Sequence, residues 1–195
     1  RGEISYREFD EAVDRLADVW RTELPAGATL GILCRNHRVP LIASFAASRA
    51  GLTAVWLNTA FSARQAGEVA AREGVDLLVR DADLAEVAAD IRTTHGEVVC
   101  DVTAESDELD ALIARGTPRP DVTPARAGRI VLLTSGTTGT PKGAPRPEPK
   151  GFVVVGSVVE RMPMRSREAT VIGPPLFHGT GLLLALMTIT LGSKL

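Results

Sequence analysis

Apolar residues along the front part of the chain follow two alternating patterns. Residues 9–20 repeat at helical spacing behind Ser5 and Glu8, which together form a capping-box sequence. A short continuous apolar run at 29–34 is typical of a buried strand. Both patterns recur, with a second capping box at Ser62 and Gln65. We therefore expect strands at 29–34, 52–57, 75–79 and 97–101, and further helices at 38–49, 62–73, 83–91 and 105–114.

Strands that alternate with amphipathic helices favour an α/β fold, in which a parallel sheet is covered by helices on its faces. A segment with three prolines, residues 116–124, ends this run and is expected to be a connector. Beyond it the pattern predicts a strand at 129–134, a helix at 151–161, a strand at 169–173, a loop at 174–181 and a buried helix at 182–191.

The composition is that of an ordinary globular protein and narrows the function classes. The 195 residues are 45% hydrophobic and 24% charged, with a formal net charge of −2 and a sequence pI of about 6.0. This balance argues against a nucleic-acid-binding protein and against membrane attachment by charge alone. The longest strongly apolar run, 182–191, is too short to span a bilayer. We expect a cytoplasmic protein. The sequence leaves open both peripheral contact with a membrane and the formation of a homodimer.

The cysteines and histidines offer few nucleophiles or metal ligands. Cys34 and Cys100 each lie in an apolar strand-like run, so we expect reduced core thiols rather than a disulfide or a metal site. His37 and His95 have no accompanying motif and are interpreted as structural or surface residues. The sequence therefore predicts no metal-ligating residue.

Residues 133–143 form the most informative stretch of the chain. Directly after a predicted strand they combine three glycines, five hydroxyl side chains and one cation, Lys142. Glycines let a loop bend closely around a polyanion, and backbone N–H groups, hydroxyls and an ammonium supply the donors. The spacing does not fit a Walker P-loop, because Thr140 and Pro141 separate Gly139 from Lys142, and it does not fit the dinucleotide fingerprint. It predicts a phosphate-binding loop of another kind.

Two segments together resemble a known family. Residues 134–143 resemble the signature phosphate loop of the acyl-adenylate-forming enzymes, which include acyl-CoA synthetases, luciferase-like ligases and the adenylation domains of peptide synthetases. Residues 174–181, with Phe177 and His178, are similar to the next core motif of that family. Three further segments are similar to the N-terminal part of fatty acyl-CoA synthetases: residues 5–8, 33–37 and 57–59. The likeness therefore covers essentially the whole chain.

The resemblance implies an enzyme that activates a fatty or other carboxylic acid with MgATP, releases pyrophosphate, and passes the acyl group from acyl-AMP to coenzyme A. ATP, Mg²⁺ and coenzyme A are the implied cofactors and co-substrates. Lys142 and His178 are the implied catalytic residues. The implied contacts to the ATP phosphates are Thr134, Ser135, Gly136, Thr137, Thr138, Gly139 and Lys142. The implied wall of the substrate pocket is Phe177, His178, Gly179 and Gly181.

Two positions need a separate comment. His178 precedes a predicted helix, so it can also be satisfied at the helix N-terminus instead of facing the acyl carboxylate. After the phosphate loop, residues 144–149 carry three prolines where many family members have a Val-x-x-Ser/Thr-His sequence. This departure leaves the phosphate contacts intact and suggests a subgroup with a stiffer loop base.

The resemblance also implies how the chain divides. Residues 1–195 correspond to an incomplete N-terminal adenylation domain of αβαβα type, whose first lobe, 29–172, includes the phosphate loop 134–143. Residues 1–28 and 173–195 are expected to belong to a second lobe that continues beyond the chain. The family's magnesium-associated glutamate, ribose-binding aspartate and C-terminal catalytic lysine have no counterpart here, so we expect a fragment that does not complete the reaction alone.

Other functions stay open on the sequence alone. A fatty acyl-AMP ligase would pass the acyl group to a carrier protein instead of coenzyme A. A non-catalytic binding or scaffold protein could retain a decayed adenylation fold. The acyl chain length is not readable, because the pocket of such enzymes is assembled largely from later residues.

Overall fold

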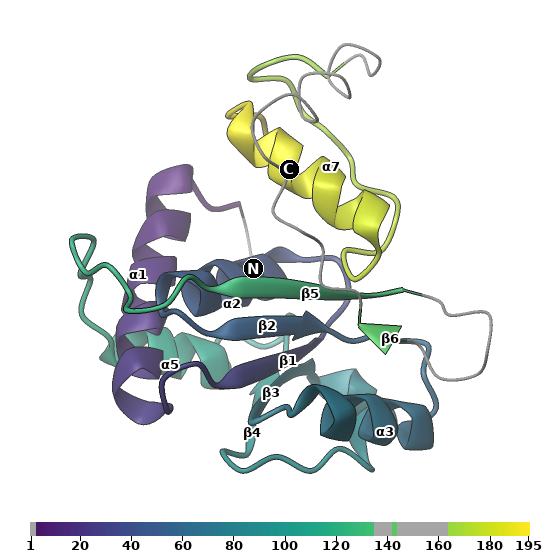
Figure 1. Cartoon of the computed structure of the whole chain (residues 1–195). Coiled ribbons are helices and arrows are strands. Elements are labelled where there is room, and N and C mark those ends of the chain that lie inside the picture. Colours follow the sequence, from purple (N-terminus) through teal and green to yellow (C-terminus); the bar gives the residue numbers. More distant parts are fainter. Residues whose placement is uncertain (1–2, 135–141, 144–163) are drawn as a thin grey trace. The chain divides into compact units, whose positions relative to one another are not determined.

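A computed structural model of the protein describes residues 3–134, 142–143 and 164–195 (Figure 1). The chain divides into two compact units, Arg1–Gly143 and Ala144–Leu195. The described elements of the first unit are α1 (Tyr6–Glu23), β1 (Thr29–Leu33), α2 (Arg38–Arg49), β2 (Thr53–Trp56), α3 (Ala63–Glu73), β3 (Leu77–Asp81), the 3₁₀ helix η1 (Ala82–Leu84), α4 (Ala85–Ala88), β4 (Glu97–Cys100), α5 (Glu108–Arg115), β5 (Arg129–Thr134) and β6 (Lys142–Gly143). The second unit contains α7 (Gly179–Thr190).

The first unit is built around one sheet with the strand order β4-β3-β1-β2-β5-β6. Neighbouring strands from β4 to β5 are all parallel, and β6 is antiparallel to β5. Thr29 of β1 lies opposite Thr53 of β2, which in turn lies opposite Arg129 of β5. The predicted α/β fold with a parallel sheet is therefore confirmed. Its five parallel strands present their carboxyl ends at one edge.

Helices cover this sheet on both faces (Figure 1). α1 packs against α2 and α5, whereas α3 packs against α4. Because crossovers between parallel strands are right-handed, α2, which leads from β1 to β2, lies on the opposite face from α3, which leads back past β1 to β3. None of the helices in the described part of the chain is long and apolar enough to cross a membrane.

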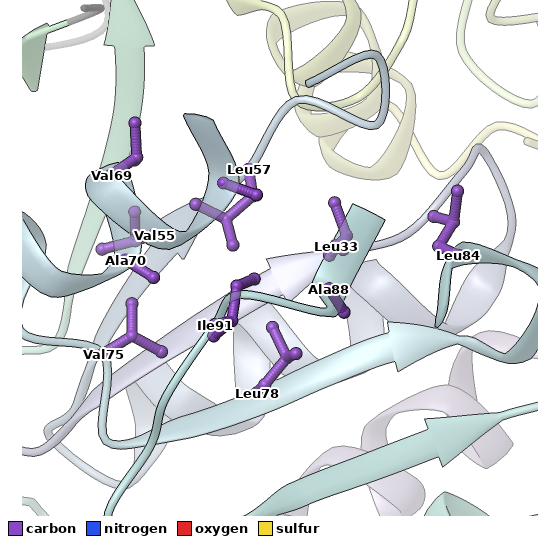
Figure 2. Packing of buried hydrophobic residues seen from close by; sticks show 11 residues of the cluster. Leu33, Val55, Leu57, Val69, Ala70, Val75, Leu78, Leu84, Ala88 and Ile91 are labelled. Carbon is purple, nitrogen blue, oxygen red and sulfur yellow. The ribbon is translucent and has the colours of Figure 1, made fainter. Parts of the chain in front are cut away.

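The face under α3 and α4 carries a buried apolar cluster (Figure 2). Leu33, Val55 and Leu78 of the strands meet Val69 of α3 and Ala88 of α4 there. Full burial of a leucine or valine side chain stabilises a fold by about 1.5–3 kcal/mol. The helices contribute mostly small side chains, which lets them approach the sheet closely: Ala66, Ala70 and Ala88.

Both predicted capping boxes form. The Ser5 hydroxyl accepts a hydrogen bond from the Glu8 amide at 3.2 Å, and the Glu8 carboxylate accepts one from the Ser5 amide at 2.6 Å. Ser62 and Gln65 make the same reciprocal pair at the start of α3. Each pair satisfies amide groups that the first turn of a helix leaves without partners, which is why the sequence predicts these helix starts.

Two consecutive elements, β3 and the helix predicted after it, differ from the prediction. β3 begins two residues later than expected, since the amide of Val75 still donates to the last turn of α3. The helix expected at 83–91 is reduced to η1 and α4. The chain turns near Asp90, whose carbonyl oxygen would lie 2.6 Å from a Cβ placed on Gly67 of α3. The chain after α4 therefore packs closely against α3.

Elements nearer the C-terminus differ as well. α5 begins three residues later than predicted, because the Asp107 carboxylate caps it. The strand predicted at 169–173 is wrong: among the described residues no strand pairs with this segment, and Val171 is 93% exposed. An extended segment without a ladder partner does not form a sheet. The helix predicted at 151–161 lies outside the described residues.

α1 belongs to the compact unit Arg1–Gly143. Its apolar face accounts for this, since Leu16 and Trp20 are completely buried where α1 packs on its neighbours. The predicted division into lobes, in which residues 1–28 group with 173–195, stays a prediction.

The pair of Glu97 and Arg80, which joins β4 to β3, should make stability depend on pH. Arg80 donates to both carboxylate oxygens of Glu97, at 2.7 and 2.8 Å, and these bonds hold the pKa of the Glu97 carboxyl below its ordinary value. A lowered pKa in the folded state stabilises the fold above the unfolded-state pKa of about 4.3. This contribution is lost as the pH falls through the folded-state pKa.

We therefore expect Glu97→Gln to lower the free energy of unfolding at neutral pH and to have little effect in strong acid. Urea denaturation of both proteins across the acidic range measures the difference. Glu68→Gln is the matched control, because Glu68 forms only an exposed pair with Arg64 at 3.5 Å. A Glu97→Gln difference that is the same at every pH would contradict the assigned role of the pair.

Candidate functional site

The predicted phosphate loop lies between two paired strands. Thr134, the last residue of β5, lies opposite Lys142, the first residue of β6, in an antiparallel ladder. A strand therefore begins at Lys142, where a Walker loop would continue into a helix. The ladder holds the two ends of the loop together at its base. The intervening residues lie outside the described ones, and their phosphate contacts stay predictions: Ser135, Gly136, Thr137, Thr138 and Gly139.

The base of this loop lies at the carboxyl edge of the parallel sheet. β5 pairs with β2, so its carboxyl end points the same way as those of β1 to β4. Ligands of open α/β sheets bind outside this edge. A glycine-rich loop that carries hydroxyls and one ammonium group at such an edge is suited to bind a polyphosphate.

His178, in the second unit, is the N-cap of α7. Its Nδ1 accepts a hydrogen bond from the Thr180 amide at 3.4 Å, and its own amide donates to the Pro175 carbonyl at 3.0 Å. A ring nitrogen that accepts a hydrogen bond carries no proton, which leaves Nε2 to carry the proton of a neutral ring. The interpretation of His178 as a helix-terminal residue is confirmed, and its catalytic role stays a prediction.

The residues that lead into α7 form a tight turn. A Cβ at Gly181 would lie 2.1 Å from the Pro175 carbonyl oxygen, so only glycine fits at this position. Leu176 is buried under the turn, and Phe177 is half-buried. α7 thereby begins three residues earlier than predicted. The role of this turn in a substrate pocket stays a prediction.

Replacing Gly181 with alanine should loosen the start of α7. The added methyl group would overlap the Pro175 carbonyl, so the turn must open or the first helical turn must fray. We expect faster amide hydrogen exchange across 179–190, measured by mass spectrometry. Gly173→Ala is the matched control in the same unit, because a Cβ at Gly173 meets no atom within 4 Å. Equal exchange in the two variants would contradict the steric argument.

A polar cluster that was not predicted lies at the carboxyl ends of β1 and β3. The Asp81 carboxylate accepts the Arg35 amide at 2.8 Å and lies 2.8 Å from Nε2 of His37. Nδ1 of His37 accepts the Val39 amide at 3.3 Å, which makes His37 the N-cap of α2. Burial acts to raise the pKa of Asp81, but the hydrogen bonds from His37 and Arg35 outweigh it and lower that pKa. The structural interpretation of His37 is confirmed.

Cys34 adds a thiol to this cluster from the end of β1. Its sulfur, the His37 ring and the Asp81 carboxylate offer ligand atoms within 4.8 Å of one another. Burial, with the neighbouring Asp81 charge, raises the pKa of the Cys34 thiol well above its ordinary value. Both cysteines are buried thiols that are not joined in a disulfide, as predicted. No sequence motif joins the three residues, because only the pairing of β1 with β3 brings Asp81 beside Cys34.

The functional residues thus fall into three groups. Thr134 and Lys142 are brought together by the β5–β6 ladder, and the turn from Phe177 to Gly181 is formed within the second unit. That these two groups serve one site stays a prediction. The third group, around Asp81, belongs to neither of the two sequence motifs that carry the other groups.

Comparisons with known proteins agree with the family resemblance of the phosphate loop. The family described as AMP-binding enzyme matches residues 1–195. Feruloyl-CoA synthase of Amycolatopsis sp. is 30% identical over 182 residues, which are 92% of this chain and 35% of that protein. Phosphinothricin tripeptide synthetase PhsC of Streptomyces viridochromogenes is 31% identical over 148 residues, which are 72% of this chain and 13% of that protein. The chain thus spans about a third or less of the length of these relatives.

Solved structures share the fold. The inhibitor-bound N-terminal domain of FACL13 from Mycobacterium tuberculosis has a TM-score of 0.79 at 19% identity, covering 98% of this chain and 49% of that one. O-succinylbenzoate coenzyme A synthetase (MenE) from Bacillus subtilis, in complex with ATP and magnesium ion, has a TM-score of 0.69 at 20% identity, covering 98% and 50%. At these identities the likeness concerns the fold alone.

Proposed function

Because the chain belongs to the AMP-binding enzyme family, we propose that it forms part of an acid–thiol ligase that activates a carboxylic acid as an acyl-adenylate. The observation that carries this proposal is the phosphate loop, 134–143, whose base lies at the carboxyl edge of the parallel sheet. ATP is the activating substrate, AMP and pyrophosphate leave, and coenzyme A accepts the acyl group. A fatty acid is the proposed acid.

The loop has the chemistry that adenylate formation requires at the phosphates. A carboxylate must attack an anionic α-phosphate, and the departing pyrophosphate gains negative charge. We assign the hydroxyls and amides of 134–139 to the β- and γ-phosphates, and Lys142 to the charge that develops on the leaving group. Because Lys142 belongs to β6, its backbone is anchored to Thr134 and does not have to be ordered at the moment of reaction.

The same residues indicate where Mg²⁺ would bind. Residues 133–143 contain hydroxyls and an ammonium group but no carboxylate, so this loop is suited to phosphate oxygens and poorly suited to hold a divalent cation itself. Mg²⁺ would be held chiefly by the ATP phosphates, where it supplies further charge neutralisation. His178, whose Nε2 carries the ring proton, is assigned to the carboxylate of the acid substrate, with Phe177 beside the acyl chain.

Pyrophosphate exchange into ATP tests this proposal directly. The purified protein, at its natural full length, is supplied with radiolabelled pyrophosphate and a panel of fatty acids of graded length, aryl acids such as ferulic acid, and amino acids. We expect exchange with fatty acids. Exchange with aryl acids or amino acids only would overturn the acid class. If no acid supports exchange, adenylation itself fails, and a binding or scaffold role takes its place.

A ligase that serves a carrier protein is the second candidate. The similarity to phosphinothricin tripeptide synthetase PhsC supports it, since that protein is a peptide synthetase by name. Mass spectrometry of the product formed with coenzyme A, and with a phosphopantetheinylated carrier protein, distinguishes the two. We expect acyl-CoA. A cytoplasmic location and a homodimer are proposed from composition and resemblance alone.

A further inference from the structure

The cluster of Cys34, His37 and Asp81 lies where the strand order of the sheet reverses, between β1 and β3. From β1 the chain continues through α2 to β2 on one side, and from β3 it continues through η1 and α4 to β4 on the other. The two connections therefore diverge at the carboxyl ends of β1 and β3. Such a switch point is the usual ligand-binding position of an open α/β sheet.

The side chains at this switch point form a mixed sulfur, nitrogen and oxygen donor set. We propose that Cys34, His37 and Asp81 bind a zinc ion. Their ligand atoms already lie within 4.8 Å of one another, and tetrahedral zinc, with bonds of about 2.0–2.3 Å, places its ligands about 3.5 Å apart. The most distant pair of ligand atoms would have to close by at most about 1.3 Å to reach that geometry. Thiolate, imidazole and carboxylate are the ligands that zinc takes in proteins, and three of them leave a fourth position for water.

The charges of the set match a divalent cation. A Cys34 thiolate and an Asp81 carboxylate together carry two negative charges, which neutralise Zn²⁺ in a pocket where Cys34 is 1% exposed. The Arg35 amide, 2.8 Å from Oδ2 of Asp81, holds the carboxylate in place from outside the set.

A nucleophilic cysteine site is excluded by the same geometry. In such a site the imidazole lies between the thiol and the carboxylate and takes the thiol proton. Here Nε2 of His37 faces Asp81, and Nδ1 is already used by the Val39 amide. His37 is therefore not placed as a base for Cys34, and the buried sulfur is closed to substrates.

Zinc binding requires one proton to leave Cys34 and one to move within His37, and the second change affects the cap of α2. The Cys34 thiol releases its proton to solvent as the sulfur–metal bond forms. His37 moves its ring proton from Nε2 to Nδ1 so that Nε2 can bind the ion. A protonated Nδ1 cannot accept the Val39 amide, so the hydrogen bond that caps α2 is lost. Zinc should therefore loosen the first turn of α2 while it tightens the ends of β1 and β3.

Cobalt substitution tests the ligand assignment without any enzyme assay. Co²⁺ bound through a thiolate gives a sulfur-to-metal charge-transfer band. We expect that band, and one bound zinc per chain by competition with a chromogenic chelator, in the unaltered protein. Cys34→Ala should abolish the band, and His37→Asn and Asp81→Asn should each weaken zinc binding by at least about tenfold. Asparagine keeps a helix-capping side chain at 37, which separates loss of the imidazole from loss of the cap.

Cys100 provides the matched control. It is buried like Cys34 and pairs in register with Asp81, yet it lies outside the set of ligand atoms. Cys100→Ala should keep both the band and the zinc stoichiometry. No zinc retained by the unaltered protein would overturn the proposal, as would a band that survives in Cys34→Ala or disappears in Cys100→Ala.

Amide exchange in the unaltered protein gives a second test that does not depend on how a variant folds. Zinc should accelerate exchange of the Val39 amide by at least about tenfold, because its acceptor is lost, while amides of β1 and β3 exchange more slowly. Unchanged or slower exchange at Val39 in the presence of bound zinc would overturn the role of His37 as a ligand.

Discussion

Replacing Arg49 with alanine should lower the free energy of unfolding by about 3 kcal/mol, the low end of the range for breaking a buried ion pair. Arg49, in the last turn of α2, donates to the carboxylates of Asp14 and Asp10 on α1. Asp14 is only 5% exposed, so removing Arg49 leaves a buried carboxylate without its cation. Urea denaturation followed by tryptophan fluorescence measures the effect, because Trp20 and Trp56 are both buried in this unit.

The controls separate this pair from ordinary surface charge. Arg64→Ala removes an exposed arginine whose partner, Glu68, lies 3.5 Å away, and should change the free energy of unfolding by less than about 0.5 kcal/mol. Replacing both partners, Arg49→Met with Asp14→Leu, should recover much of the loss, because no charge is then left buried. Equal effects of Arg49→Ala and Arg64→Ala would show that the Asp14 carboxylate finds another partner.

Replacing Lys142 with alanine should slow pyrophosphate exchange by about 10²–10³-fold, the range for removing one preorganised donor from a developing charge. Lys142 is the single cation of the phosphate loop, and β6 anchors it opposite Thr134. The expected loss lies mainly in the rate of adenylate formation and less in acid binding, because the charge develops on the leaving pyrophosphate. Exchange measured at saturating acid and ATP gives this rate.

Two further variants define what the lysine supplies. Lys142→Arg keeps the charge but replaces a compact ammonium group with a planar guanidinium, and should recover only part of the rate. Lys194→Ala removes a lysine with an exposed side chain after α7 and should leave exchange unchanged. An unaltered rate in Lys142→Ala would refute the assignment of this residue to the phosphates.

Features that depend on neighbouring residues were predictable from the sequence. The capping boxes of α1 and α3 are such features, because a serine and a residue three positions later satisfy each other's amides wherever the helix lies. The phosphate loop is also a local feature, since its glycines, hydroxyls and lysine are adjacent in the chain, and its phosphate contacts stay predictions. At Lys142, where a Walker loop would continue into a helix, β6 begins.

Features that depend on distant partners were not predictable. The segment 169–173 has the residues of a strand, but a strand exists only where a second one offers hydrogen bonds. Beyond α4 the backbone of Asp90 lies close to Gly67 of α3, a residue that no local pattern connects to it. The Asp107 cap lay within reach of a sequence argument, since Asp at an N-cap followed by an acceptor at the third helical position is a variant of the capping box.

The sequence by itself determined the alternation of strands and helices, the start of the capped helices and the composition of the predicted phosphate loop, because each is a matter of residues within one turn or one loop. Tertiary structure alone decided the strand order β4-β3-β1-β2-β5-β6, the packing of α1 on α2 and α5, and the meeting of Cys34 and His37 with Asp81. These depend on which strands pair and which faces are buried together. Those choices are set by the summed burial of many side chains and leave no short motif in the chain.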